Sequence, residues 1–179
     1  LFGATFVLNK FFGVSRTNGR VFSSADGVAW TPVATPAASL QGLAYGAGRL
    51  VAVGAGGTIV TSTNGTSWSL QQSGTTNQLL GVNFVNNRFV AVGVLGTILT
   101  SPDGLVWTPR SAQGNQSNLQ NTAFGNGRYV IAGQGGRVIL TSTDAENWSI
   151  LTGGPSQSFA LLGAAASSTT AVAVGQNGV

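Results

Sequence analysis

The sequence contains no cysteine, histidine or methionine, and only 7% of its 179 residues are charged. Without cysteine and histidine the chain has no disulfide, no thiol nucleophile, no Ser-His-Asp triad and no nitrogen or sulfur ligand for a metal. Carboxylate chemistry is restricted to Asp26, Asp103, Asp144 and Glu146. We therefore expect no cofactor and no metal centre.

The charges that are present give a small positive surplus. Eight basic residues against four acidic ones leave a net charge of +4 and a pI near 10.8. The basic residues are spread along the sequence with no run of five, so we do not expect a nucleic-acid partner. No apolar stretch reaches the ~18 residues needed to cross a bilayer, so we expect no membrane span. Low charge, many small polar residues and absent cysteine favour an exported bacterial protein, extracellular or periplasmic.

A repeat of about 40 residues organises the sequence. The tryptophans Trp30, Trp68, Trp107 and Trp148 are spaced by 38, 39 and 41 residues, and each closes a related phrase, as in TSTNGTSW and TSPDGLVW. A leucine followed by a variable residue opens each unit. Such periodicity is typical of solenoids and propellers. The units are expected at 1–39, 40–78, 79–118 and 119–160, with a partial unit at 161–179.

Each unit has the pattern of four short strands separated by turn residues. In the third unit the expected strands are Leu80–Val85, Arg88–Val92, Thr97–Ser101 and Val106–Arg110. No window has a useful helical period. Four antiparallel strands repeated in tandem predict an all-β fold, a β-propeller with four full blades and half of a fifth in a single domain or fragment.

The valines and glycines of the repeat have predicted places in this fold. Stacked sheets bury each other's faces, so recurring valines and isoleucines should form layers between blades. These residues are Val51, Val53, Val90, Val92, Val130, Val172, Val174, Val21, Ile59 and Ile98. Gly54, Gly93, Gly133 and Gly175 are expected to adopt positive φ after the second strand, and Gly3, Gly42, Gly81 and Gly163 to relieve crowding in the innermost strand.

The phrase that ends in tryptophan resembles the Asp-box, or bacterial neuraminidase repeat, of sialidase-like propellers. Its copies comprise Ser24, Asp26 and Trp30; Ser62, Asn64 and Trp68; Ser101, Asp103 and Trp107; and Ser142, Asp144 and Trp148. We expect the acidic residue to accept hydrogen bonds from backbone N–H groups one and two residues on, and the tryptophan to cover the turn. The tandem layout is also similar to propellers of the photosystem II assembly-factor class.

The resemblance implies a fold more than a function, because such turns occur in hydrolases, lectins, assembly factors and adhesins. A sialidase-type site would need an arginine cluster, a tyrosine nucleophile with a glutamate, and an acid. Tyr45 and Tyr129 stand where other units carry phenylalanine, which favours core packing. We expect a non-catalytic exported scaffold that binds protein or carbohydrate through rim loops. The alternatives are a glycoside hydrolase whose catalytic residues lie on other blades, and an assembly factor for a membrane complex.

One basic residue recurs nine positions after each opening leucine, giving Lys10, Arg49, Arg88 and Arg128. This row could bind an anionic partner. Alternatively, each basic group could pair with the acid in the turn of its own unit, and this is the favoured interpretation. The expected pairs are Lys10 with Asp26, Arg88 with Asp103 and Arg128 with Asp144, which leaves Arg49 opposite Asn64 and free.

The fifth unit supplies only two strands. An open strand edge has unpaired backbone groups that can pair with another strand. We expect the edge at 161–179 to be completed by additional blades or by a second polypeptide.

Overall fold

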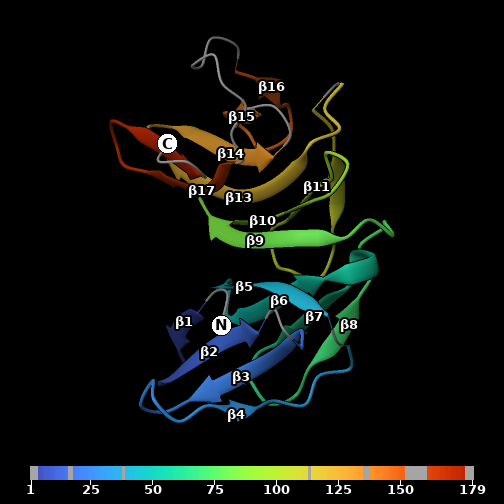
Figure 1. Ribbon diagram of the computed structural model, residues 1–179, viewed down its shortest axis with the longest axis vertical. Helices are drawn as coiled ribbons and strands as arrows, with labels where there is room; N and C mark the ends of the chain where they lie inside the picture. The colour runs from blue at the N-terminus through green and yellow to red at the C-terminus, as the bar shows by residue number, and fades with distance from the viewer. Residues whose placement is uncertain are drawn as a thin grey trace.

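The computed structural model describes residues 4–15, 18–37, 39–112, 114–134, 138–151 and 161–175. These residues form four four-stranded antiparallel sheets and one two-stranded sheet, and the strands of each sheet follow sequence order (Figure 1). The first two sheets are β1 (Ala4–Val7), β2 (Lys10–Ser15), β3 (Arg20–Ser24) and β4 (Thr31–Pro32), then β5 (Leu40–Gly46), β6 (Arg49–Gly54), β7 (Ile59–Ser62) and β8 (Ser69–Gln71).

The next two four-stranded sheets repeat this order. They are β9 (Leu79–Val85), β10 (Arg88–Gly93), β11 (Ile98–Ser101) and β12 (Thr108–Arg110), then β13 (Asn118–Gly125), β14 (Arg128–Gln134), β15 (Ile139–Ser142) and β16 (Ser149–Ile150). β17 (Leu161–Ala166) and β18 (Ala171–Gly175) form the last, two-stranded sheet. The described part of the protein holds one helix, the three-residue η1 (Ala55–Gly57), which is far too short to span a bilayer.

The first hairpin of each full sheet closes with a two-residue turn in which both residues have positive φ. In the third sheet these are Asn86 and Asn87, with φ of 48° and 56°. The equivalent pairs are Leu8 and Asn9, Ala47 and Gly48, and Asn126 and Gly127. Positive φ at both positions gives the turn a twist that matches the right-handed twist of the paired strands. These turns place the first residue of each second strand at one end of its sheet. The row of basic residues consists of these first residues.

The five sheets follow one another around an open arc, with β1 and β17 on the same side of it (Figure 1). The first strands of successive sheets pack beside each other, β1 with β5, β5 with β9, β9 with β13 and β13 with β17. Tandem antiparallel sheets arranged in this way are the blades of a β-propeller. The expected all-β propeller architecture is therefore confirmed, with a ring that is not closed.

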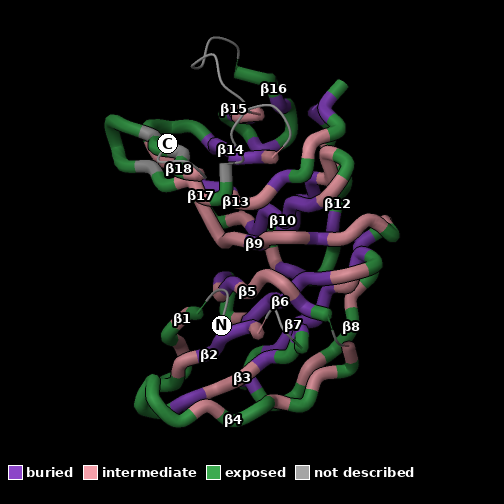
Figure 2. The backbone as a smooth tube through the Cα atoms, viewed as in Figure 1, coloured by how far each residue is buried: buried purple, intermediate pink, exposed green. Residues whose placement is uncertain are grey.

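Buried residues follow the middle strands of the blades (Figure 2), and the clusters that they form lie between consecutive blades. Between the third and fourth blades, Val90, Val92 and Ile98 pack against Leu119, Ile131 and other residues of the fourth. The two preceding junctions are built the same way, with Val51, Val53 and Ile59 in one and Val14, Val21 and Phe12 in the other. The predicted layers are confirmed there, whereas Val172 and Val174 of the two-stranded sheet remain 51% and 52% exposed.

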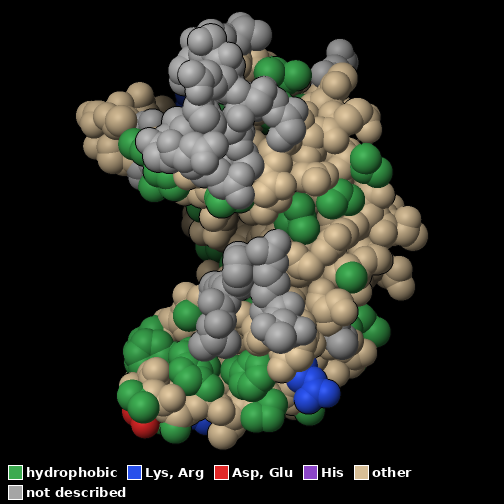
Figure 3. Space-filling model, viewed as in Figure 1, with side chains coloured by type: hydrophobic (Ala, Val, Ile, Leu, Met, Phe, Trp, Pro, Cys, Tyr) green, Lys and Arg blue, Asp and Glu red, His purple; other side chains and the backbone are tan. Residues whose placement is uncertain are grey.

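The two tyrosines lie in these layers as the repeat predicted. Tyr129 is 2% exposed and meets Trp148 edge to face, with ring centroids 6.1 Å apart. Tyr45 packs against the cluster between the first two blades. Apolar side chains also gather on the outer surface of the first blade (Figure 3), where Phe6, Leu8 and Val28 are exposed.

The predicted reason for the glycines that end the second strands is wrong. Gly54 is extended, with φ of −170°, and neither Gly93 nor Gly133 has a positive φ. The cause is a close approach of backbone: a Cβ on Gly54 would lie 2.3 Å from the Ser39 carbonyl oxygen, and one on Gly93 would lie 2.2 Å from that of Gln78.

Crowding in the innermost strands is confirmed at Gly42 and Gly81. A Cβ on Gly42 would come within 3.0 Å of the Gly81 backbone, and one on Gly81 would lie 2.3 Å from the Gln120 carbonyl oxygen of the next blade. Gly3 lies outside the described residues. Glycine at these positions therefore lets neighbouring inner strands approach each other closely.

Candidate functional site

Each full blade carries a turn between its third and fourth strands in which a serine and an acidic or amide side chain bond to each other and to the backbone. We call these the Ser-x-Asx turns; their paired residues are Ser24 and Asp26, Ser62 and Asn64, Ser101 and Asp103, and Ser142 and Asp144. The serine Oγ donates to the Asx Oδ1 at 2.9–3.1 Å. The same Oγ accepts from the N–H three residues on.

The Asx oxygen accepts from the N–H groups two and three residues on, one position later than predicted. At Asp144, for example, Oδ1 accepts from the backbone of Glu146 and Asn147, both at 2.8 Å. The later register follows from the serine, which takes the N–H one residue after the Asx through its own Oγ. The sequence pattern included this serine but gave no signal of which N–H group it would bond.

The tryptophan closes each turn with its indole N–H. Nε1 donates to the carbonyl oxygen of the third residue before it in all four blades, at 3.0 Å in the third blade. Trp107 and Trp148 are buried, while Trp30 and Trp68 are half-buried. The predicted covering of the turn by tryptophan is therefore observed, and Trp68, Trp107 and Trp148 also pack in or against the layers between blades.

The pKa values of the three carboxyl groups in these turns are lowered. Bonds from the backbone N–H groups of Val28 and Ala29 hold the pKa of Asp26 below its usual value, and the N–H of Leu105 does the same most strongly for the pKa of Asp103. The pKa of Asp144 is lowered further, because Asn147 donates from both its backbone and its side chain. These groups accept hydrogen bonds as fixed anions and have no proton to transfer at neutral pH.

The predicted pairing of the basic row with acids of the same blade is wrong for Arg88. Its Nη1 lies 3.5 Å from Glu146 Oε1 and donates to the Asp144 carbonyl oxygen at 3.3 Å, and both residues belong to the next blade. Among the described residues, neither Lys10 with Asp26 nor Arg128 with Asp144 forms an ion pair. Arg88 therefore reaches across the junction to the turn of the neighbouring blade.

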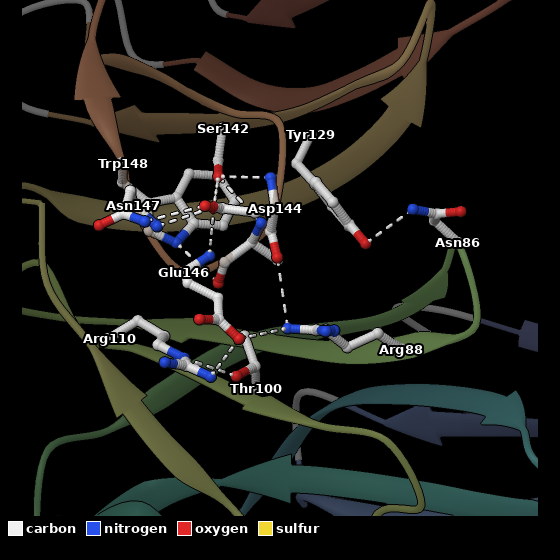
Figure 4. Close-up of polar contacts among 11 residues, drawn as sticks. Asn86, Arg88, Thr100, Arg110, Tyr129, Ser142, Asp144, Glu146, Asn147 and Trp148 are labelled. Atoms are coloured by element: carbon white, nitrogen blue, oxygen red, sulfur yellow. Dashed lines mark hydrogen bonds and ion pairs between the residues drawn. The ribbon is translucent and has the colours of Figure 1, made fainter.

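Glu146 is the centre of this junction and was missed by the sequence reasoning (Figure 4). Its Oε1 also lies 3.1 Å from Nη2 of Arg110, whose Nε donates to Thr100 Oγ1 at 3.0 Å. Two arginines from one blade thus hold one carboxylate from the next. The signal was present, since Arg110 and Glu146 each stand at a repeat position where the other full units carry uncharged residues.

Arg49 occupies the same place as Arg88, one junction earlier. Its Cδ lies 3.1 Å from where a Cβ on Gly104 would be, so Arg49 also reaches across to the next blade's turn. Its Nε is buried and has no hydrogen-bond partner. Lys10 and Arg128 are exposed. The structure therefore places the row at one end of the blades, with Arg49 half-buried and its charge uncompensated within the described residues.

A cavity of about 180 Å³ lies among the inner strands. In the second to fifth blades, a register shift in the first hairpin takes the residue after the opening leucine out of the hydrogen-bonding ladder. The displaced residues, Gln41, Leu80, Gln120 and Leu162, all line the cavity. Asn83 crosses between blades there, donating to Asn121 Oδ1 and to the Thr122 carbonyl oxygen, both at 2.8 Å. The lining contains no charged residue.

Within the described ranges no group of three or more His, Cys, Asp or Glu side chains could hold a metal ion. The arrangement offers instead cationic side chains at one end of the blades and a cavity among the inner strands whose lining includes four amide side chains. The molecule is a β-propeller with antiparallel meander blades.

Solved structures of several propellers match this architecture. Virginiamycin B lyase from Staphylococcus aureus superposes with a TM-score of 0.82 at 14% identity, over 92% of this protein and 59% of that one. A streptogramin B lyase gives 0.79 at 12%, over 91% and 57%. YCF48 bound to D1 peptide gives 0.66 at 17%, over 88% and 54%. The 179 residues therefore span between half and three fifths of the length of these proteins, and the likeness establishes the fold alone.

No protein-family model and no curated protein sequence matches this sequence.

Proposed function

We propose that this protein is an exported, non-catalytic propeller scaffold that binds a protein partner. Acidic side chains of the partner contact the basic row. The observation that carries the proposal is the distribution of charge. All four carboxylates of the sequence take part in internal contacts, three in Ser-x-Asx turns and Glu146 between two arginines. Lys10, Arg49 and Arg128 are left as cations at one end of the blades.

The comparisons support a binding role. One similar propeller, YCF48, is solved with a D1 peptide bound. The lyases are enzymes, and a histidine-to-alanine variant of virginiamycin B lyase is described as catalytically inactive. These 179 residues contain no histidine. Three of the carboxylates that could replace it are hydrogen-bond acceptors in turns, and Glu146 is paired with two arginines, which supports a scaffold over an enzyme for this part of the propeller. We also propose that the Ser-x-Asx turns are Asp-boxes, which the hydrogen bonds of their serine, acidic residue and tryptophan support.

Charge neutralisation tests the proposal. The triple variant Lys10→Gln, Arg49→Gln, Arg128→Gln should lose most of its affinity for an immobilised peptide of alternating glycine and glutamate, and the wild-type affinity should fall steeply with added salt. Arg20→Gln is the matched control, because Arg20 is exposed at the opposite end of its blade. Equal loss in the control and the triple variant would point to nonspecific attraction and contradict the proposal.

A second candidate function is carbohydrate binding in the inner cavity, and the uncharged amide lining favours it. Amide side chains donate to and accept from sugar hydroxyls without cost from a buried charge. Gln120→Leu should then weaken binding to a glycan array while leaving acidic-peptide binding unchanged. An unchanged glycan profile would remove this candidate.

A further inference from the structure

Two consecutive junctions between blades are constructed from equivalent residues. In each, a strand residue donates to a buried threonine of the strand beside it: Arg110 Nε to Thr100 Oγ1 at 3.0 Å, and Gln71 Nε2 to Thr61 Oγ1 at 3.1 Å. In each, an arginine opens the second strand and crosses to the next blade's turn. The equivalent pairs are Arg88 with Arg49, Arg110 with Gln71 and Thr100 with Thr61.

The junctions differ in what lies between those donors. Between the third and fourth blades, the Glu146 carboxylate lies between Arg88 and Arg110, at 3.5 and 3.1 Å (Figure 4). Between the second and third blades, the same turn position, two residues after the Asx, is Leu105. Leu105 is 38% exposed and has no polar atom to offer an arginine. The protein fills one of these junctions with its own carboxylate and leaves the other without one.

Arg49 has a buried polar atom without a hydrogen-bond partner. Its Nε is buried and donates to nothing, although the residue as a whole is only half-buried. Asp103, the acid of the neighbouring turn, has its Oδ1 taken by Ser101 and by two backbone N–H groups. Within the part of the protein that the structure describes, no carboxylate lies at ion-pairing distance from Arg49. A buried guanidinium donor without an acceptor is rare and costly.

We propose that Arg49, together with the side-chain amide of Gln71, binds a carboxylate of the protein partner in the place that Glu146 occupies at the next junction. The proposal rests on the proposed function and names the group recognised. A carboxylate is favoured because it is the group that the equivalent donors hold in this molecule, and because its two oxygens match a guanidinium. The source is either an acidic side chain or the C-terminus of the partner.

The test introduces a carboxylate into the junction between the second and third blades. Leu105→Glu should place a carboxylate beside Arg49 and block the partner's, and Leu105→Gln is the neutral control of the same size. The probe is acetyl-glycyl-glutamyl-glycine amide, titrated while the ¹⁵N resonance of Arg49 Nε is followed by NMR. The Leu105→Glu variant should bind the probe about tenfold more weakly than Leu105→Gln, the loss expected for a charge-assisted hydrogen bond.

Two further peptides define the group that is bound. The glutamine counterpart of the probe should bind about tenfold more weakly than the glutamate peptide, because it lacks the charge. A triglycine peptide with a free C-terminus separates the two sources: binding as tight as the glutamate peptide assigns a C-terminal carboxylate, and weak binding assigns an acidic side chain. Equal binding of the glutamate and glutamine peptides, or of the two Leu105 variants, would overturn the proposal.

This experiment fails separately from the test of the basic row. If the triple variant of the row loses affinity for acidic peptide while Leu105→Glu does not, the row binds anions and the Arg49 site is refuted. A urea unfolding curve for each Leu105 variant checks that the fold is retained. Leu105 lies in an exposed part of its turn, so both variants should unfold near the wild-type midpoint.

Discussion

Replacing the glycine of a Ser-x-Asx turn by alanine should have very different costs in two blades that share the same turn. Gly27 and Gly65 have similar left-handed backbones, with φ of 78° and 74°. A Cβ on Gly65 would lie 2.3 Å from Cζ and 2.6 Å from Cε1 of Phe12, which is 2% exposed. A Cβ on Gly27 would lie 3.5 Å from the half-buried Phe11 ring, an ordinary contact.

The magnitudes follow from these two terms. The left-handed conformation costs a residue with a Cβ about 1–2 kcal/mol, so Gly27→Ala should destabilise the fold by about that amount. Gly65→Ala adds the displacement of a packed ring, an overpacking cost of about 1–3 kcal/mol, for a total of about 2–5 kcal/mol. The entropy lost by the unfolded state on replacing glycine is common to both variants and cancels in the comparison.

Urea unfolding at pH 7 measures the difference. Gly65→Ala should unfold at a clearly lower midpoint than Gly27→Ala, with the same dependence on urea concentration. Equal midpoints would mean that Phe12 moves aside without cost. The layer between the first two blades would then not be close-packed, which would refute the reasoning.

Three other results are expected. Because the pKa of Asp103 is lowered in the folded state, the stability that its carboxylate supplies is present above about pH 4 and is lost as the pH falls through the pKa of the folded state. Urea midpoints at pH 6 and pH 2 should therefore differ less in Asp103→Asn than in the wild type. Glu146→Gln should cost only about 0–1 kcal/mol, because the paired groups are partly exposed, and the loss should shrink in high salt. Gly81→Ala should cost about 1–3 kcal/mol, since its Cβ would strike the Gln120 carbonyl oxygen. The cost should exceed that of Gly163→Ala, whose Cβ would meet a methyl group of the exposed Val174 at 3.3 Å; thermal unfolding of both variants checks this.

The blade structure follows from local sequence, and so it could be predicted closely. The third-unit strands fall within one or two residues of their expected ends. The largest difference is at β12, which begins at Thr108 and not at Val106, because Val106 donates its N–H to Asp103 and so belongs to the turn. The turn residues and the alternation of apolar residues along each strand act within one hairpin, where register is set by nearby residues.

Contacts between blades were harder to predict, because they depend on the tilt of one sheet against the next. The pairing of Arg88 with Asp103 assumed that residues close in one blade would meet, yet the arginine crosses to Glu146. Gly54 was misinterpreted within its own hairpin: its backbone is extended, and its small size serves a close approach to Ser39, which directly precedes β5. Comparing residues at equivalent positions of successive units would have identified Glu146 as an unusual charge in its turn, but not its distances to the two arginines.

The displaced residue in the inner strands of the second to fifth blades has a consequence for how such a protein could change. Gln41, Leu80, Gln120 and Leu162 stand outside the hydrogen-bonding ladder, and each contributes to a common lining. Because none of them carries the pairing of its strand, a substitution there alters the chemistry of the lining without disturbing the sheet. A repeat of this kind can acquire a new ligand by single replacements, one blade at a time, while its framework stays constant.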